Sequence, residues 1–160
     1  MIKTVILIIS DKGSTGERED KCGPLISQVL DNSVYSLAGC EIIPDDINAI
    51  KSSLSRHSGK ADLILTSGGT GLSPRDVTAE ATLDIIDKEI PGIPEAIRTA
   101  GMKHTDRSML SRAVAGVRGK CLIINMPGSP NAVKESIEVI LNVIPHAVEK
   151  IKGSEEECAR

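Results

Sequence analysis

The chain has 160 residues, of which 40% are hydrophobic and 26% charged, and a formal net charge of −3. That length is enough for one domain with an adequate core. Lysines and arginines are scattered, so the sequence has no basic stripe, and Tyr35 is the only aromatic residue that could stack on a base. The composition therefore argues against nucleic acid as a partner.

The first segment, Thr4 to Ile9, is an apolar run too short to span a bilayer, and no signal-peptide cleavage pattern follows it. It predicts a buried strand in a cytoplasmic protein that does not associate with a membrane. The four cysteines and three histidines are dispersed and form no C-x-x-C pair, so neither a zinc site nor a disulfide framework is predicted.

Further apolar runs at Ala61 to Leu65 and Cys121 to Asn125 are typical of strands buried on both faces, and Glu41 to Pro44 is a weaker candidate. Helical patterns separate these runs, which predicts a parallel sheet with helices packed on either side. The helices are expected at 24–30, 47–57, 81–86, 95–102 and from 130 onwards.

The last helix has clear boundaries in the sequence. Ser129 can cap its first turn, Pro145 should kink or restart it, and Gly153 should end it. We therefore expect a single domain over residues 1–153, with residues 154–160 as an acidic tail.

Loops at the carboxyl ends of the strands of a doubly wound sheet converge on one crevice, where ligands bind. Four loops are placed to do so here. They are Ser10 to Gly16, Pro44 to Asp46, Ser67 to Asp76 and Met126 to Ser129.

The third of these loops is a glycine-rich turn between a strand and a helix, with the sequence Ser67, Gly68, Gly69, Thr70, Gly71. Glycines let backbone N–H groups approach an anion, and the following helix N-terminus adds partial positive charge. The turn matches neither the P-loop nor the dinucleotide-binding pattern. A tight turn without a ligand would explain the glycines but not the adjoining Arg75 and Asp76, so the turn predicts phosphate binding with Arg75 as an added cation.

Asp45 and Asp76 each come just beyond a predicted strand, so both carboxylates can face the same crevice. Such a pair suits Mg²⁺, which prefers oxygen ligands and is usually held by one or two carboxylates plus substrate phosphates. The alternatives are that Asp76 is a charge at a helix start and that Asp45 is a turn residue after Pro44.

The fourth loop, with Pro127, Gly128 and Ser129, presents backbone donors and a hydroxyl at a helix N-terminus, which predicts a second anion-binding turn. Simple helix initiation is the alternative. Ser10 and Asp11 place a hydroxyl and a carboxylate in the first loop, where an ordinary polar loop is the alternative.

Taken together, these motifs resemble the molybdopterin adenylyltransferase family of the MogA and MoaB type. The resemblance spans nearly the whole chain, and the combination of GGTG with RDVT is its most specific part. Its elements are Ser10, Asp11, Gly16, Asp20, Gly23, Ile43 to Asp46, Thr66 to Thr82, Leu110 to Arg112 and Asn125 to Ser129.

The resemblance implies a three-layer α/β/α domain with a mostly parallel, doubly wound sheet, assembled as a trimer or a dimer of trimers. It implies transfer of AMP from ATP to molybdopterin with Mg²⁺, and a possible molybdotransferase partner. Asp45 and Asp76 match the family's two essential carboxylates, while the GGTG turn and Pro127 to Ser129 match its ligand-binding loops.

Two other functions remain open at this level. A MoaB-like protein that binds the pterin or a partner without transferring anything would carry similar motifs. A nucleotide pyrophosphatase of the competence-related family would share the fold, but that family typically carries GGLG followed by D-D-x-T, whereas this chain has GGTG followed by RDVT.

Overall fold

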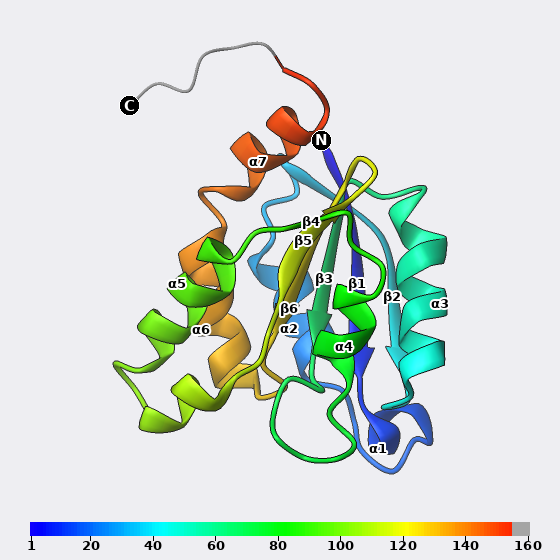
Figure 1. Ribbon diagram of the computed structural model, residues 1–160, viewed down its shortest axis with the longest axis vertical. Helices are drawn as coiled ribbons and strands as arrows, with labels where there is room; N and C mark the ends of the chain where they lie inside the picture. Colours follow the sequence, from blue (N-terminus) through cyan, green and yellow to red (C-terminus); the bar gives the residue numbers. More distant parts are fainter. Residues whose placement is uncertain (155–160) are drawn as a thin grey trace.

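A six-stranded sheet forms the centre of the computed structural model, which describes residues 1–154 (Figure 1). The strand order is β2-β1-β3-β6-β5-β4, and the first four strands of that order are parallel. The strands are β1 (Ile2–Ile9), β2 (Tyr35–Ile43), β3 (Leu63–Ser67), β4 (Lys88–Glu89), β5 (Ala115–Arg118) and β6 (Cys121–Met126).

Side chains of the central strands alternate between two separate hydrophobic clusters, as the period of a strand requires. In β1, Ile6 and Ile8 belong to one cluster, while Val5, Leu7 and Ile9 belong to the other. Both faces of the strand are therefore buried, which is why it reads as a continuous apolar run.

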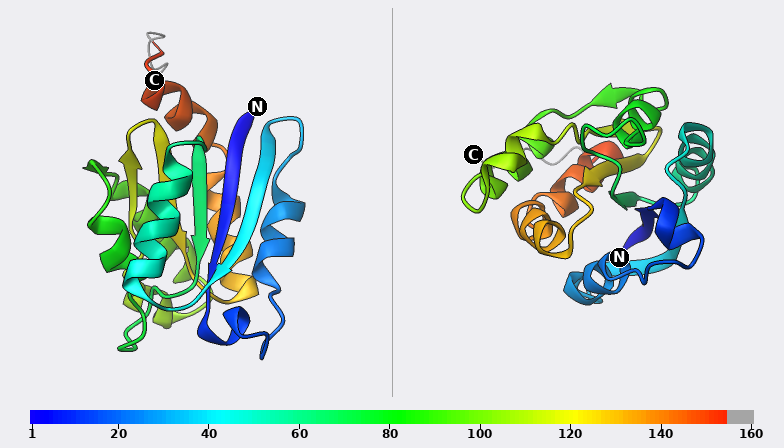
Figure 2. Two further views of the ribbon diagram at one scale, coloured as in Figure 1. Left: turned by 90° about the vertical axis from the view of Figure 1, so that its right-hand side faces the viewer. Right: turned by 90° about the horizontal axis from the view of Figure 1, so that it is seen from below.

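Helices cover both faces of the sheet and complete three layers (Figure 2). The first hydrophobic cluster is closed by α2 (Cys22–Val29), α5 (Gly92–Gly101), α6 (Pro130–Ile140) and α7 (Ile144–Ile151). The second is closed by α3 (Ile47–Ser58) and α4 (Thr78–Leu83). The short α1 (Asp11–Ser14) follows β1 directly, and a 3₁₀ helix, η1, spans Asp106–Leu110.

The sheet is mixed at one edge, because β5 is antiparallel to β6 and β4 is antiparallel to β5. Neither short strand is expected from apolar periodicity. Strand β2 also begins at Tyr35, earlier than the predicted Glu41 to Pro44, because it is an edge strand with an irregular pattern of exposure. Many side chains of this edge strand are exposed, so its apolar residues do not form a periodic pattern. Apolar periodicity therefore predicts a shorter strand than the structure has.

Two helix boundaries involve prolines. The helix expected at 95–102 begins earlier, at Gly92, so that Pro94 lies inside the first turn of α5, where a proline gives up no intrahelical hydrogen bond. The predicted restart at Pro145 is confirmed, because a separate helix, α7, begins there, and Gly153 follows with φ of 95°. The predicted boundary at residue 153 stays a prediction, since residues 155–160 of the expected tail lie outside the described residues.

The connection after β1 leads to α2 on one face of the sheet, and the connection after β3 leads to α4 on the other face. The carboxyl ends of β1 and β3 are therefore the topological switch point, where doubly wound sheets bind ligands. The chain begins, and α7 lies, at the opposite end of the sheet (Figure 1). Within residues 1–154 no helix is long and apolar enough to cross a membrane.

Candidate active site

A cavity of about 540 Å³ lies at the carboxyl ends of β1 and β3. All four predicted loops contribute to its wall, through residues that include Ser10, Asp45, Ser67, Gly68, Gly69, Asp76 and Gly128. The loops come from distant parts of the sequence, and the parallel strands bring them to one edge. The predicted convergence is present in the structure.

The glycine-rich turn is packed too tightly for side chains. Gly68 has φ of 104°, and a Cβ there would lie 2.3 Å from the carbonyl oxygen of Ile9. Gly69 has φ of 66°, and a Cβ there would lie 2.2 Å from Oγ1 of Thr78. Both positions combine a left-handed backbone with a close contact, which only glycine accommodates.

The two predicted anion-binding turns lie against each other. The N–H of Gly68 donates to the carbonyl of Met126 at 3.1 Å, and the hydroxyl of Ser67 donates to the carbonyl of Pro127 at 2.9 Å. A Cβ on Gly128 would come within 3.2 Å of the Gly68 Cα. The glycines therefore let two backbones meet at one wall of the cavity.

Asp45 is fixed by a reciprocal pair of hydrogen bonds with Asp11. The N–H of Asp11 donates to Oδ2 of Asp45 at 2.8 Å, and the N–H of Asp45 donates to Oδ1 of Asp11 at 3.0 Å. Partial burial raises the pKa of Asp45, and the negative charges of Asp11 and Asp76 add to the increase although the hydrogen bond from Asp11 opposes it. The carboxylate therefore lies in an environment of excess negative charge.

Asp76 is held by its own loop. Its Oδ2 accepts from the N–H of Ser73 at 2.9 Å, and its N–H donates to the Ser73 carbonyl at 2.9 Å. Gly71 approaches so closely that a Cβ there would lie 2.8 Å from the same Oδ2. Backbone atoms of the loop therefore lie close around Oδ2 of Asp76.

In the described part of the chain, the second oxygen of both carboxylates is free. Among residues 1–154, neither Oδ1 of Asp45 nor Oδ1 of Asp76 has a hydrogen-bond or ion-pair partner, and both residues line the cavity. Oδ1 of Asp45 is 3.4 Å from the position a Cβ of Gly69 would take, so it lies beside the glycine-rich turn.

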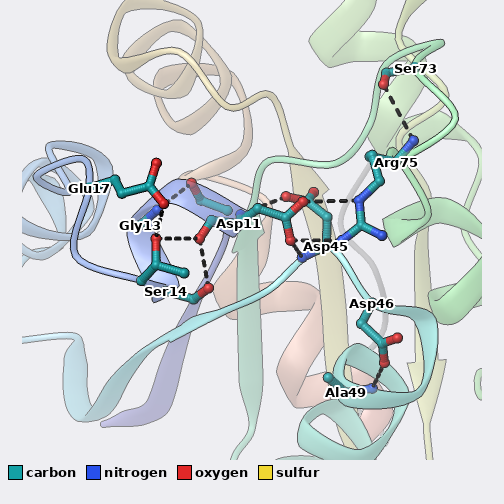
Figure 3. Close-up of polar contacts among 11 residues, drawn as sticks. Asp11, Gly13, Ser14, Glu17, Asp45, Asp46, Ala49, Ser73 and Arg75 are labelled. Atoms are coloured by element: carbon teal, nitrogen blue, oxygen red, sulfur yellow. Dashed lines mark hydrogen bonds and ion pairs between the residues drawn. The ribbon is translucent and has the colours of Figure 1, made fainter.

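Arg75 does not extend as a free cation. Its guanidinium makes two hydrogen bonds to the carboxylate of Asp11, at 3.0 Å from Nε and 2.8 Å from Nη2 (Figure 3). The hydrogen bond from Arg75 lowers the pKa of Asp11, and the N–H of Asp45 adds to this. Arg75 thus ties the glycine-rich loop to the loop after β1, and its expected role as a cation for phosphate stays a prediction.

Thr70, Gly71, Pro127 and Ser129 line a second cavity of about 410 Å³. It shares Gly69, Asp76 and Gly128 with the first cavity, so the two lie side by side. Two of the predicted hydroxyls also have structural roles, since Ser10 caps α1 and Ser129 caps α6.

The segment between α1 and α2 forms a wall of the first cavity that motif reasoning missed. Arg18, Lys21 and Cys22 line it there, and burial raises the pKa of the Cys22 thiol. Within the described residues, the side chains of Arg18 and Lys21 form no ion pair. Asp20, which accepts from the N–H groups of Cys22 and Gly23, is the one sequence signal of an ordered turn there.

Within residues 1–154, no group of three or more His, Cys, Asp or Glu side chains is arranged to hold a metal ion alone. Two carboxylates with one free oxygen each still fit Mg²⁺, because that ion keeps several waters and takes further oxygens from substrate phosphates. The residues present therefore suit a cation that arrives with a phosphate ligand.

Comparison with known proteins agrees with this geometry. The model of the probable molybdopterin-binding domain family matches residues 5–146. A molybdopterin adenylyltransferase of Helicobacter pylori is 39% identical over 155 residues, covering 93% of this chain and 87% of that protein.

Among solved structures, the molybdopterin biosynthesis enzyme MoaB of Thermus thermophilus superposes with a TM-score of 0.90 at 46% identity, covering 96% of this chain and 98% of that one. A CinA protein of Thermoplasma acidophilum, with a TM-score of 0.68 at 15% identity and coverage of 89% and 97%, shares the fold alone. The chain therefore belongs to the family of probable molybdopterin-binding domains found in molybdenum cofactor biosynthesis proteins.

Proposed function

We propose that this protein is a molybdopterin adenylyltransferase, which transfers AMP from ATP to the terminal phosphate of molybdopterin. The observation that carries the proposal is the convergence of Asp45 and Asp76, each with one free oxygen, on a cavity walled by two glycine-containing turns. The activity named for the Helicobacter pylori relative supports the same reaction.

The reaction joins two polyanions, and the chain's own groups suit that task. A terminal phosphate oxygen of molybdopterin forms a bond to the α-phosphorus of ATP, while the bond from that phosphorus to the bridging oxygen breaks and pyrophosphate leaves. The attacking oxygen is already anionic near neutral pH, so the protein needs no strong base. Catalysis then consists of holding the oxygen in line with phosphorus and stabilising the charge that develops.

Backbone N–H groups of the two turns would bind phosphate oxygens, and the glycines allow that close approach. The free oxygens of Asp45 and Asp76 would hold Mg²⁺ together with the phosphates. When bound, this ion would neutralise charge on the triphosphate and on the leaving pyrophosphate. Arg18 and Lys21 line the same cavity, form no ion pair with any residue from 1 to 154, and would contact further phosphate oxygens.

Two neighbouring cavities suit two substrates that must meet at one phosphorus. The smaller one has a largely apolar wall with residues such as Ile97 and Leu110, which suits a heterocycle. The larger one carries the charged groups and suits phosphates.

The test is turnover by the purified protein with ATP, Mg²⁺ and molybdopterin. We expect pyrophosphate release that depends on molybdopterin, and a product heavier than molybdopterin by one AMP. Tight molybdopterin binding without pyrophosphate release would instead indicate a binding module. Hydrolysis of ADP-ribose without adenylylation would indicate the competence-related pyrophosphatase.

The family resemblance extends the proposal to assembly and location. We propose a homotrimer or a dimer of trimers in the cytoplasm, with a molybdotransferase that receives the product. Exposed apolar side chains such as Leu72 and Met109 would be available for subunit contact. Light scattering on the purified protein would measure the mass, and a monomer at all concentrations would contradict this part.

A further inference from the structure

Arg112 lies between η1 and β5 and binds the glycine-rich loop at several points. Its Nε donates to the carbonyl of Gly71 at 2.8 Å, and its Nη2 donates to the carbonyl of Asp76 at 2.8 Å. Its backbone N–H donates to the carbonyl of Thr70 at 2.9 Å. The third guanidinium nitrogen, Nη1, pairs with the carboxylate of Glu80 in the first turn of α4.

These bonds attach both ends of the segment 70–76 to one residue, through its backbone N–H at Thr70 and its side chain at Gly71 and Asp76. The middle of that segment is exposed at Leu72, Ser73, Pro74 and Arg75. Few buried apolar contacts hold it, so hydrogen bonds decide its conformation. Within the segment itself, the bonds join only Ser73, Arg75 and Asp76, while Arg75 also reaches Asp11.

We propose that Arg112 is a positioning residue, which holds the free oxygen of Asp76 in the cavity by fixing the carbonyls of Gly71 and Asp76. Arg112 lines neither cavity, so it acts through the loop and not by touching substrate. The kinetic consequence rests on the proposed function, whereas the effect on loop conformation does not.

An arginine suits this position because its planar guanidinium carries several donors in a fixed arrangement. A lysine has one nitrogen and cannot reach both carbonyls and Glu80 in that geometry. The ion pair with Arg112 lowers the pKa of Glu80, so Glu80 stays ionised and keeps the guanidinium turned toward α4. The pair thereby ties the loop to the helix that follows it.

The first experiment measures amide hydrogen exchange in the ligand-free protein for wild type, Arg112→Lys and Arg118→Lys. Arg118 is a matched control, because its Nη1 also donates to a backbone carbonyl, that of Ile85 at 2.7 Å, and it lines neither cavity. We expect exchange over residues 70–78 to rise about tenfold in Arg112→Lys, since the side-chain hydrogen bonds to the carbonyls of Gly71 and Asp76 are lost. Arg118→Lys should leave these amides unchanged.

The second experiment measures the Mg²⁺ concentration for half-maximal rate, kcat, and KM for molybdopterin in the same variants. For Arg112→Lys we expect the Mg²⁺ requirement to rise and kcat to fall, each by about tenfold, with KM for molybdopterin unchanged. In Arg112→Ala, added guanidinium ion should restore part of kcat, whereas ammonium should not.

Wild-type exchange in Arg112→Lys would overturn the proposal, as would a change confined to KM for molybdopterin, which would indicate direct substrate contact. If Arg112→Ala does not fold, Arg112→Lys decides alone. If the wild-type protein shows no turnover, the proposed function fails. The positioning role is then judged by exchange and by calorimetric titration of ATP with Mg²⁺, which should bind more weakly to Arg112→Lys.

Discussion

Carboxylates at the two ends of the sheet have different surroundings. At the amino end, Asp62 uses both oxygens within the protein: Oδ2 accepts from the N–H of Lys3 at 2.9 Å, and Oδ1 pairs with Nζ of Lys152 at 2.8 Å. At the carboxyl end, Asp45 and Asp76 each use one oxygen on a backbone N–H, the other oxygen has no partner among residues 1–154, and both residues line the cavity.

The pKa values of Asp45 and Asp62 shift in opposite directions. Burial raises the pKa of Asp45, with neighbouring carboxylates adding to it. Burial also acts to raise the pKa of Asp62, but the hydrogen bonds from Lys152 and Lys3 outweigh it, so that pKa lies below its usual value. Asp62 is therefore paired within the fold, whereas Asp45, the proposed ligand-binding carboxylate, forms no ion pair in the part of the chain that the structure describes.

The largest expected effect is on the adenylylation rate, when the carboxylate of Asp76 is replaced by an amide that binds a cation poorly. Asp76→Asn keeps an oxygen to accept from Ser73 and should fold normally, but we expect the adenylylation rate to fall on the order of a hundredfold or more. The matched change at the other end, Asp62→Asn, should leave the rate unchanged. Equal adenylylation rates for Asp76→Asn and wild type would show that Asp76 is not part of the active site.

A second test concerns the turn between the carboxylates. In Gly69→Ala the new methyl group would meet Oγ1 of Thr78 at a left-handed φ, and strain of about 1–3 kcal/mol should displace the turn. We expect ATP affinity to fall by roughly tenfold to a hundredfold, measured by calorimetry. Gly59→Ala is the control, because its φ is −77° and a Cβ there has open space; unchanged ATP affinity in Gly69→Ala would place the nucleotide elsewhere.

A third test separates function from stability at Asp45. Folding raises the pKa of Asp45, so the folded state binds more protons than the unfolded state between the usual and the raised value, and stability decreases as pH rises through that window. At neutral pH the ionised carboxylate therefore destabilises the fold. Asp45→Asn should raise the melting temperature at pH 7 and raise the Mg²⁺ requirement on the order of tenfold or more.

Thermal unfolding at several pH values and a Mg²⁺ titration measure both quantities in the same preparation. A lower melting temperature with an unchanged Mg²⁺ requirement would make Asp45 a structural turn residue.

The smallest effect is expected at the amino end. Folding lowers the pKa of Asp62, so its contribution to stability is present above the usual carboxyl pKa and is lost as pH falls through the lowered value. Lys152→Met should cost about 0.2–1 kcal/mol at neutral pH, because the pair is partly exposed. Urea unfolding should show this difference shrinking in acid; a difference that persists at low pH would show that packing, not charge, is lost.

The sequence predicted the central parallel strands and the convergence of four loops, because buried strands and strand-to-helix turns leave local patterns. Thr4 to Ile9 and Cys121 to Asn125 differ from β1 and β6 by at most two residues at an end. The antiparallel strands β4 and β5 were missed, since two and four residues are too few for a periodic signal.

The sequence could not predict which side chains bind to each other across the site. Arg75 is 64 positions from Asp11 and Arg112 is 41 from Gly71, and no local rule indicates either pairing. The assignment of Asp45 and Asp76 to Mg²⁺ stays a prediction, although their placement at one cavity agrees with it. Arg18 and Lys21 were missed because charged loop residues carry no pattern of their own.

A crystal of this protein soaked with ATP and Mg²⁺ would show whether Asp45 and Asp76 bind the cation beside the triphosphate. We expect one Mg²⁺ at about 2.0–2.1 Å from an oxygen of Asp45 or Asp76 or of both, bridging to the triphosphate, with phosphate oxygens against the backbone of the glycine-rich turn. Triphosphate bound outside this cavity, or a bound cation that neither aspartate contacts, would contradict it.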